Sequence, residues 1–115
     1  AKQAREDVEC GRRFAEALPE KSLVLTHNPN MWLIWGRNAA QLSLAREAKN
    51  RVHGKFFTQY PGGVYFHLNF WCQVPDPPQN SLCEDAFSYY ETTLFSECKP
   101  GETRYALYRM SPKSD

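Results

Sequence analysis

The chain has 115 residues, of which 42% are hydrophobic and 14% aromatic, and this is enough for one packed core but hardly for two. Its 14 basic and 13 acidic residues nearly balance, and no stretch has the dense positive charge that attracts nucleic-acid phosphates. No apolar run reaches the length of about eighteen residues that a membrane span needs. The sequence therefore predicts a single domain over residues 1–115, without a membrane or nucleic-acid partner.

Residues 1–30 are predicted to form a helix and a short strand that extend the main fold. Apolar residues recur at intervals of three to four in residues 4–18, which is the pattern of an amphipathic helix, and Pro19 ends it. Residues 22–26 are a short strand candidate, with Leu23, Val24 and Leu25 at its centre. The apolar residues 31–35 are too few for a helix, so we expect them to form a buried strand or a plug against the core.

The strongest helical pattern lies in residues 38–53. Asn38 suits an N-cap, Gly54 suits a C-terminal cap, and apolar residues recur at every fourth position, at Ala40, Leu44, Ala48 and Val52. The last turns are basic, with Arg46, Lys49, Arg51, His53 and Lys55. Positive charge at a helix C-terminus complements the helix dipole, so we interpret this basic cluster as a solvated helix end in preference to a binding patch.

Beyond this helix the periodicity changes to two, which is typical of strands. Apolar residues alternate strictly through residues 64–74, and this predicts one long strand with its even-numbered side chains beneath the helix. The proline-rich residues 75–81 are expected to form a surface loop, because proline cannot donate to a strand ladder.

Two further strands are predicted in the C-terminal third. Residues 86–97 form the first, with a bulge near Tyr89 and Tyr90, and residues 103–110 form the return strand after a turn. Residues 111–115 are expected to be a frayed tail. The fold class is therefore α+β, an antiparallel sheet of about four strands wrapped on one main helix, with residues 31–110 as the core and an extra N-terminal helix.

The odd-numbered face of the long strand carries the candidate binding residues. Tyr65, His67, Asn69 and Trp71 share this face, and Tyr108 is expected to be exposed on the return strand. Such a face is typical of a recognition surface, whereas cross-strand pairing alone also explains it. A different interpretation makes His67 a general acid or base, with a carboxylate reaching it from the next strand, either Glu91 or Glu97.

The four cysteines contain no C-x-x-C pair and no Cys/His knuckle, so no metal site is predicted. We expect free thiols in an intracellular protein, cytoplasmic or nuclear, because cysteines are sparse and the aromatic content can build a core. A Cys83–Cys98 disulfide is the alternative. His27, alone in a turn rich in Asn and Pro, is expected to be solvated.

The order of one helix followed by long strands over residues 39–110 resembles the cystatin-like, or monellin-like, arrangement. The segment Tyr65 to Trp71 also resembles the His-x-Asn-Phe strand of an uncharacterised family of plant domains thought to share that fold. A cystatin-type inhibitor would use a hairpin at Gln59, Gly62 and Gly63, of which only the Gln and the final Gly match the inhibitors' pattern. The resemblance implies a scaffold and does not fix a function.

Three functions from different classes follow from these observations. The favoured one is a non-catalytic protein-interaction module that uses the exposed face or an edge strand, with residues 104–110 as the expected edge and a homodimer as one use of it. The alternatives are a cysteine protease inhibitor and a small enzyme that uses His67. No nucleophile, phosphate-binding loop or acidic metal cluster is evident, so no cofactor is expected and enzyme activity is disfavoured.

Overall fold

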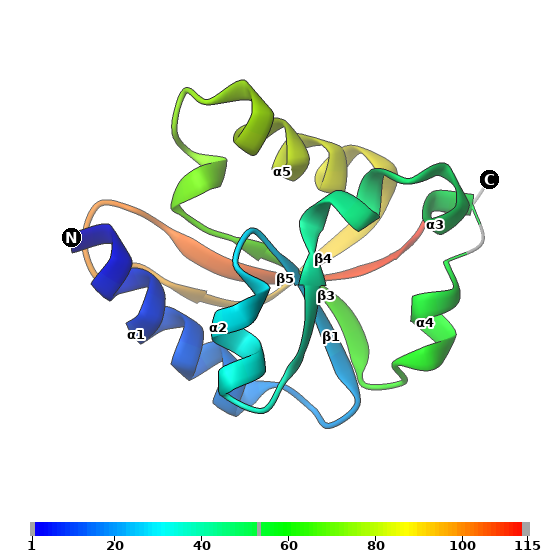
Figure 1. The fold of residues 1–115 in the computed structure, drawn as a ribbon, viewed down its shortest axis with the longest axis horizontal. Coiled ribbons are helices and arrows are strands. Elements are labelled where there is room, and N and C mark those ends of the chain that lie inside the picture. Colours follow the sequence, from blue (N-terminus) through cyan, green and yellow to red (C-terminus); the bar gives the residue numbers. More distant parts are fainter. Residues whose placement is uncertain (1, 53, 114–115) are drawn as a thin grey trace.

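The computed structural model describes residues 2–52 and 54–113, and it shows a five-stranded mixed sheet with helices on both faces (Figure 1). The strands are β1 (Ser22–Thr26), β2 (Asn38–Gln41), β3 (Gly63–Leu68), β4 (Tyr90–Cys98) and β5 (Tyr105–Pro112). The α-helices are α1 (Lys2–Ala17), α2 (Pro29–Ile34), α3 (Ala48–Val52), α4 (Lys55–Gln59) and α5 (Pro77–Tyr89). Two short 3-10 helices complete the fold, η1 (Leu42–Arg46) and η2 (Phe70–Cys72).

The sheet has the strand order β2-β1-β3-β5-β4. β1 pairs in parallel with both β2 and β3, while β5 pairs antiparallel with β3 and β4. The chain therefore leaves β1 towards one side of the sheet, forms β2, and returns to the other side to form β3. In open α/β sheets, ligands bind outside the carboxyl ends of the strands at such a reversal.

Two hydrophobic clusters lie on opposite faces of the sheet. One contains α1 and α2 residues such as Phe14 and Trp32, packed on Val24 and Tyr65. The other contains residues of η1, α4 and α5, packed on strand residues such as Phe66. Because both faces are covered, all five residues of β1 and the first five of β3 are buried, as is typical of central parallel strands.

The α+β class is confirmed, but the predicted antiparallel sheet of about four strands is wrong, because the sheet is mixed and has five strands. β1 also lies inside the sheet, so it is not an extension of the fold. The predicted helix at residues 4–18 and the strand at 22–26 are confirmed as α1 and β1. The resemblance to the cystatin-like arrangement stays a prediction.

The long strand predicted at residues 64–74 ends at Leu68. Asn69 stops it, because its side-chain Oδ1 accepts a hydrogen bond from the backbone N–H of Trp71 at 3.0 Å and caps η2. The alternating pattern continues beyond Leu68 in the sequence, but the backbone no longer pairs.

The helix predicted at residues 38–53 is replaced by β2, η1 and α3. Asn38 is no N-cap; its side chain donates to the carbonyl oxygen of Ser22 at 3.1 Å and fixes the start of β2 beside β1. Pairing with β1 overrides a helical preference that is weak over a few residues. His53, which was expected in the last turn, lies outside the described residues.

Prolines begin two helices that were not predicted. Pro29 begins α2, where a buried strand was expected at 31–35, and Pro77 begins α5, where a loop was expected at 75–81. Proline suits the first turn because its missing N–H has no partner there in any case. α5 continues to Tyr89, so the strand predicted from residue 86 begins later.

The C-terminal strands differ from the prediction in three details. The bulge of β4 lies between Leu94 and Ser96, not near Tyr89 and Tyr90. β5 extends to Pro112, so residues 111 and 112 belong to a strand and not to a tail, while residues 114 and 115 lie outside the described part. β5 is also an inner strand, so the expected edge at 104–110 is wrong: the free edges belong to β2 and β4.

The four cysteines form two disulfides, Cys10–Cys98 and Cys72–Cys83. The expectation of free thiols and the alternative pairing of Cys83 with Cys98 are therefore both wrong. Cys83 lies in the cluster beneath α5 and Cys98 in the cluster beneath α1, so the sheet separates them. Among the helices of the described residues, none is both long and apolar enough to cross a bilayer.

Candidate functional site

The predicted recognition residues do not form an exposed face. Tyr65, His67 and Asn69 are almost fully buried, because β3 is a central strand with helices over both of its faces. Trp71 is 43% exposed and lies on η2, away from the sheet face. Tyr108 is half-buried on β5, where it stacks near Phe66, so only Trp71 keeps the expected exposure.

His67 instead belongs to a polar cluster sealed between the sheet and two helices. Its Nδ1 lies 2.8 Å from the hydroxyl oxygen of Thr26 on β1, and its Nε2 lies 3.5 Å from the carboxylate of Asp7 on α1. The Trp32 ring of α2 packs against the imidazole, with centroids 5.1 Å apart. Because the Thr26 oxygen also accepts the N–H of Asn28, its hydroxyl proton is free to point at Nδ1, which leaves the proton of His67 on Nε2.

Burial moves the two pKa values of this cluster in opposite directions. Desolvation lowers the pKa of His67 from 6.5 to about 3, so the imidazole is neutral at pH 7. Desolvation raises the pKa of Asp7 from 3.8 to about 6. The 3.5 Å contact is therefore a neutral imidazole facing a carboxylate at pH 7, not an ion pair, and the distance is too long for a strong hydrogen bond.

The order hydroxyl, imidazole, carboxylate has the form of a catalytic triad, but a substrate has no access to it. Thr26, His67 and Trp32 each have no exposed surface. The carboxylate comes from Asp7, whereas Glu97, one of the two predicted partners, binds Arg104 at 2.8 Å. A nucleophile needs a reacting atom within about 3 Å, and a hydroxyl without exposed surface does not meet a substrate from solvent.

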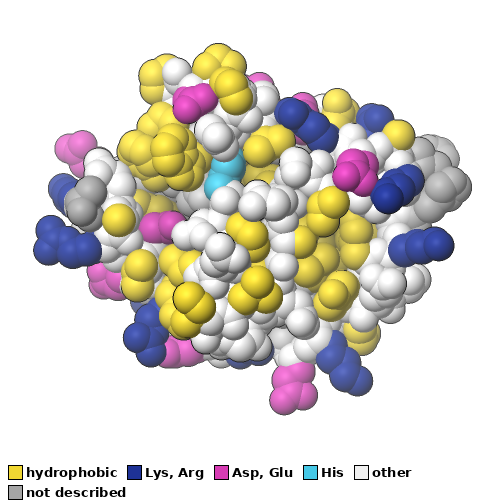
Figure 2. All heavy atoms as spheres, viewed as in Figure 1, with side chains coloured by type: hydrophobic (Ala, Val, Ile, Leu, Met, Phe, Trp, Pro, Cys, Tyr) yellow, Lys and Arg dark blue, Asp and Glu magenta, His cyan; other side chains and the backbone are white. Residues whose placement is uncertain are grey.

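A groove lies beside the edge strand β2. Its volume is ≈ 390 Å³, within the range of small-ligand and peptide sites. β2 borders it on one side and α3 and α4 on the other (Figure 1), and Figure 2 shows hydrophobic side chains on this face with charged ones around them. Its apolar lining consists of Leu23, Leu33, Ala39, Ala40, Leu44, Phe56 and Tyr60.

Polar groups are placed around this apolar lining. Lys49 and Lys55 contribute two positive charges and Glu47 one negative charge, and Lys49 lies 3.6 Å from Glu47. Asn50 also lines the groove, and its side chain donates to the carbonyl oxygen of Leu44 at 2.9 Å, which fixes the wall formed by η1 and α3. The groove is thus apolar inside with a net positive rim.

Of the predicted inhibitory hairpin, only Gln59 lies at this groove. Gly62 and Gly63 form the tight entry to β3 instead of an exposed loop. Gly62 is required by packing, because a Cβ atom there would lie 2.1 Å from the carbonyl oxygen of Glu20, and Gly63 is required by its backbone φ of 111°. No hairpin is present at these residues.

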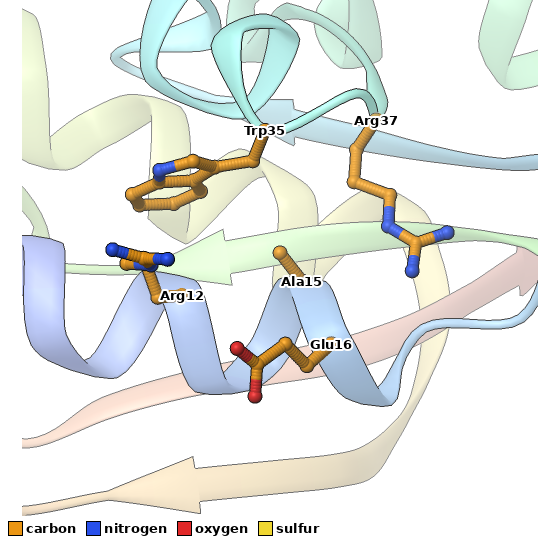
Figure 3. A pocket seen from close by; sticks show the side chains of 5 residues that line it. All are labelled: Arg12, Ala15, Glu16, Trp35 and Arg37. Atoms are coloured by element: carbon orange, nitrogen blue, oxygen red, sulfur yellow. The ribbon is translucent and has the colours of Figure 1, made fainter.

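A second, smaller pocket of ≈ 230 Å³ lies between α1 and the end of α2. Figure 3 shows Arg12, Ala15 and Glu16 on one side of it and Trp35 and Arg37 on the other. Arg12 and Glu16 are exposed and therefore solvated, while Arg37 is half-buried. This pocket has weaker features of a binding site than the groove.

Sequence reasoning missed most of the groove. Ala40 and Leu44 were predicted to lie on one face of a helix, and Gln59 was predicted only as part of an inhibitory hairpin. The one usable indication was the basic cluster at Lys49 and Lys55, which was assigned to a solvated helix end.

Comparisons with known proteins give this chain no relative: no family model, no curated protein and no solved structure matches it.

Proposed function

We propose that this domain is a protein-interaction module that binds an extended segment of a partner along the free edge of β2. The observation that carries this proposal is the coincidence of an unpaired strand edge with an apolar groove of ≈ 390 Å³ beside it. Strand addition supplies backbone hydrogen bonds, and a groove beside the strand supplies specificity for alternate side chains.

The composition of β2 suits close approach by another backbone. Its four residues are Asn38, Ala39, Ala40 and Gln41, so no bulky side chain stands over the edge. Because β2 pairs only with β1, half of its backbone N–H and C=O groups point away from the sheet. A segment pairing there would direct every second side chain towards Leu44 and Phe56.

Charge supports an acidic partner segment. Lys49 and Lys55 outnumber Glu47 at the rim, and Lys49 is 78% exposed on its side chain. Rim charges of this kind act mainly on association rate and partner choice, while the apolar contacts supply most of the affinity. The proposed ligand is therefore an extended peptide with alternating apolar side chains and acidic residues between them.

The alternatives find less support. The hydroxyl of Thr26 and the imidazole of His67 are fully buried, and the accessible groove holds no histidine or cysteine among its described lining. Gln59, Gly62 and Gly63 form no protruding wedge, so inhibition of a protease has no surface to carry it. A homodimer could use either free edge: β4 carries Glu91 and Glu97, and pairing through β2 would occupy the edge proposed for the peptide.

The compartment is part of this proposal. The expectation of a cytoplasmic or nuclear protein rested on free thiols, whereas both cysteine pairs are bonded. Stable disulfides are typical of oxidising compartments, so we propose that the domain works in one. Alkylation of thiols at the moment of cell lysis tests this: four protected cysteines support it, and four modified cysteines contradict it.

A peptide selection tests the binding function. A library of capped octapeptides with apolar residues at alternate positions would be panned in two versions, with acidic or with lysine residues between them. We expect enrichment from the acidic version with micromolar dissociation constants, because the edge is short. No enrichment from either version, or binders that compete only with a probe of the Trp71 surface, would remove the proposal.

A further inference from the structure

Three segments that are distant in sequence meet outside the carboxyl ends of β1 and β3. His27 directly follows β1, Cys72 ends η2 after β3, and Cys83 lies on α5. A ring nitrogen of His27 and the two sulfur atoms all lie within 4.8 Å of one another. Among the residues that the structure describes, no other group of three such side chains comes together in this way.

The hydrogen bonding of His27 leaves one nitrogen available as a ligand. Its Nε2 lies 2.9 Å from the carbonyl oxygen of Gln79, and since a carbonyl only accepts, Nε2 carries the proton. Nδ1 then carries a lone pair, and it is buried with no hydrogen-bond partner in the described structure. Histidines that bind metals are held in this manner, with the far N–H donated to a backbone carbonyl.

The environment also favours the neutral ring that a metal ligand needs. Burial lowers the pKa of His27 from its usual value of 6.5, and the bond to Gln79 opposes this only in part. The sequence expectation of a solvated turn histidine is therefore wrong, since the residue is half-buried against α5. A neutral imidazole and two thiolates form a soft donor set that Zn²⁺ accepts in tetrahedral sites.

We propose that reduction of the Cys72–Cys83 disulfide creates a zinc site formed by both thiolates and Nδ1 of His27. A dithiol, such as that of a thiol–disulfide oxidoreductase, transfers two electrons and two protons, so that its own sulfurs become a disulfide and Cys72 and Cys83 become thiols. Zn²⁺ then displaces one proton from each thiol. Three protein ligands leave the fourth tetrahedral position to water or to a further ligand.

The other disulfide provides an internal control. Cys10–Cys98 joins α1 to the end of β4, and its polar neighbour is Arg13, whose guanidinium donates to Sγ of Cys98 at 3.5 Å. A cation next to the sulfur opposes a metal ion at that position. The site therefore depends on one cysteine pair and not on thiols in general.

Titration with Co²⁺, a spectroscopic substitute for Zn²⁺, tests the site. We expect one equivalent of Co²⁺ to give a thiolate-to-cobalt absorption band in the dithiol-reduced protein, to be displaced by Zn²⁺, and to give no band in the oxidised protein. Cys10→Ser should keep the band, and Cys72→Ser should lose it. His27→Ala should weaken Co²⁺ binding about a hundredfold, the upper range for loss of a group that supports a metal site.

Each contrary outcome overturns the inference. It is wrong if the reduced wild-type protein shows no band while circular dichroism shows that it remains folded, or if the band survives Cys72→Ser. Equal Co²⁺ affinity in wild type and His27→Ala would also exclude the histidine as a ligand. If reduction itself unfolds the protein, Zn²⁺ must restore the folded circular dichroism spectrum of the wild type but not of His27→Ala. Equal recovery in the two proteins would contradict the site.

Discussion

The sealed cluster at His67 and the open groove along β2 lie on the same sheet, and they differ in a way that bears on function. In the cluster the imidazole of His67 lies 2.8 Å from the Thr26 hydroxyl and 3.5 Å from the Asp7 carboxylate, but Thr26 and His67 have no exposed surface. The groove is accessible but is lined by apolar residues, two lysines and one glutamate. Reactive residue types and access are thus separated between the two regions.

Because the two regions are separate, substitutions in the cluster and in the groove should change different measured quantities. Substitutions in the cluster should change the free energy of unfolding and leave ligand binding intact in the folded protein. Substitutions at the rim of the groove should change ligand affinity and leave unfolding nearly unchanged. The predictions below test this division, beginning with the largest expected effect.

His67→Ala should produce the largest change. It removes a fully buried ring that contacts Trp32 and leaves the hydroxyl of Thr26 without its acceptor. Cavity formation and an unpaired buried donor together should lower the free energy of unfolding by about 3 kcal/mol. Urea unfolding followed by Trp fluorescence measures this, and a loss below about 0.5 kcal/mol would show that the cluster is not sealed.

Asp7→Asn should stabilise the protein at neutral pH. The pKa of Asp7 is about 6 in the folded state and 3.8 in the unfolded chain. The stability that the folded protein gains from holding this proton is therefore fully present below pH 3.8 and is lost as the pH rises through 6. That shift corresponds to about 2–3 kcal/mol. The free energy of unfolding of the variant should exceed that of wild type by this amount at pH 7.5 and by little at pH 4.

His67 makes the free energy of unfolding change with pH in the opposite direction. Its pKa is about 3 in the folded state and 6.5 in the unfolded chain, so its contribution is lost as pH falls from 6.5 towards 3. The free energy of unfolding of wild type should therefore vary little between pH 4 and pH 6, where the effects of Asp7 and His67 oppose each other. That of Asp7→Asn should fall steadily as the pH falls. A difference between the proteins that does not vary with pH would contradict these assignments.

Leu33→Asp should act on the groove without acting on the fold. Leu33 lines the groove and is 52% exposed, so a carboxylate there costs little stability but repels an acidic segment and removes apolar contact. We expect about a tenfold loss of peptide affinity, equivalent to about 1.4 kcal/mol. Ile34→Asp is the matched control, because Ile34 is adjacent, 82% exposed and outside the groove lining. Equal losses in both variants would place the peptide elsewhere.

Lys49→Glu should give the smallest effect. The lysine is at the rim and pairs with Glu47 across 3.6 Å in water, so its charge contributes little to a static contact. We expect a loss of affinity of a few-fold at about 0.05 M salt that diminishes at about 0.5 M, since salt screens exposed charges. A loss that is independent of salt would show that the lysine makes a buried contact.

How much of the fold could be predicted depended on whether local pattern or pairing decides an element. α1 follows from the helical periodicity of its own residues and β1 from its short apolar run, and both were predicted. β2 was not predicted, because Asn38 to Gln41 have no intrinsic preference for a strand. They form a strand only because they pair with β1. α5 was missed because its prolines were interpreted as breaking a sheet, although the same residues suit a helix start.

The candidate site was less predictable than the fold, for one reason. Whether His67 faces solvent depends on the position of β3 in the sheet, and that position follows from the two crossings around β1. In an antiparallel sheet with one open face the odd-numbered residues of β3 would be exposed, whereas between two layers of helices they are not. The pairing of Cys72 with Cys83 likewise depends on α5 lying over η2, which no spacing in the sequence indicates.

Amide hydrogen exchange of β2 in the presence of a selected acidic octapeptide tests the central claim most directly. If the segment adds to the sheet, the outward-pointing backbone amides of residues 38–41 should exchange at least about tenfold more slowly in the complex. The amides of the other free edge, β4, should exchange at an unchanged rate. Slowed exchange in β4 with none in β2, or saturating binding without slowed exchange in either edge, would contradict strand addition at the groove.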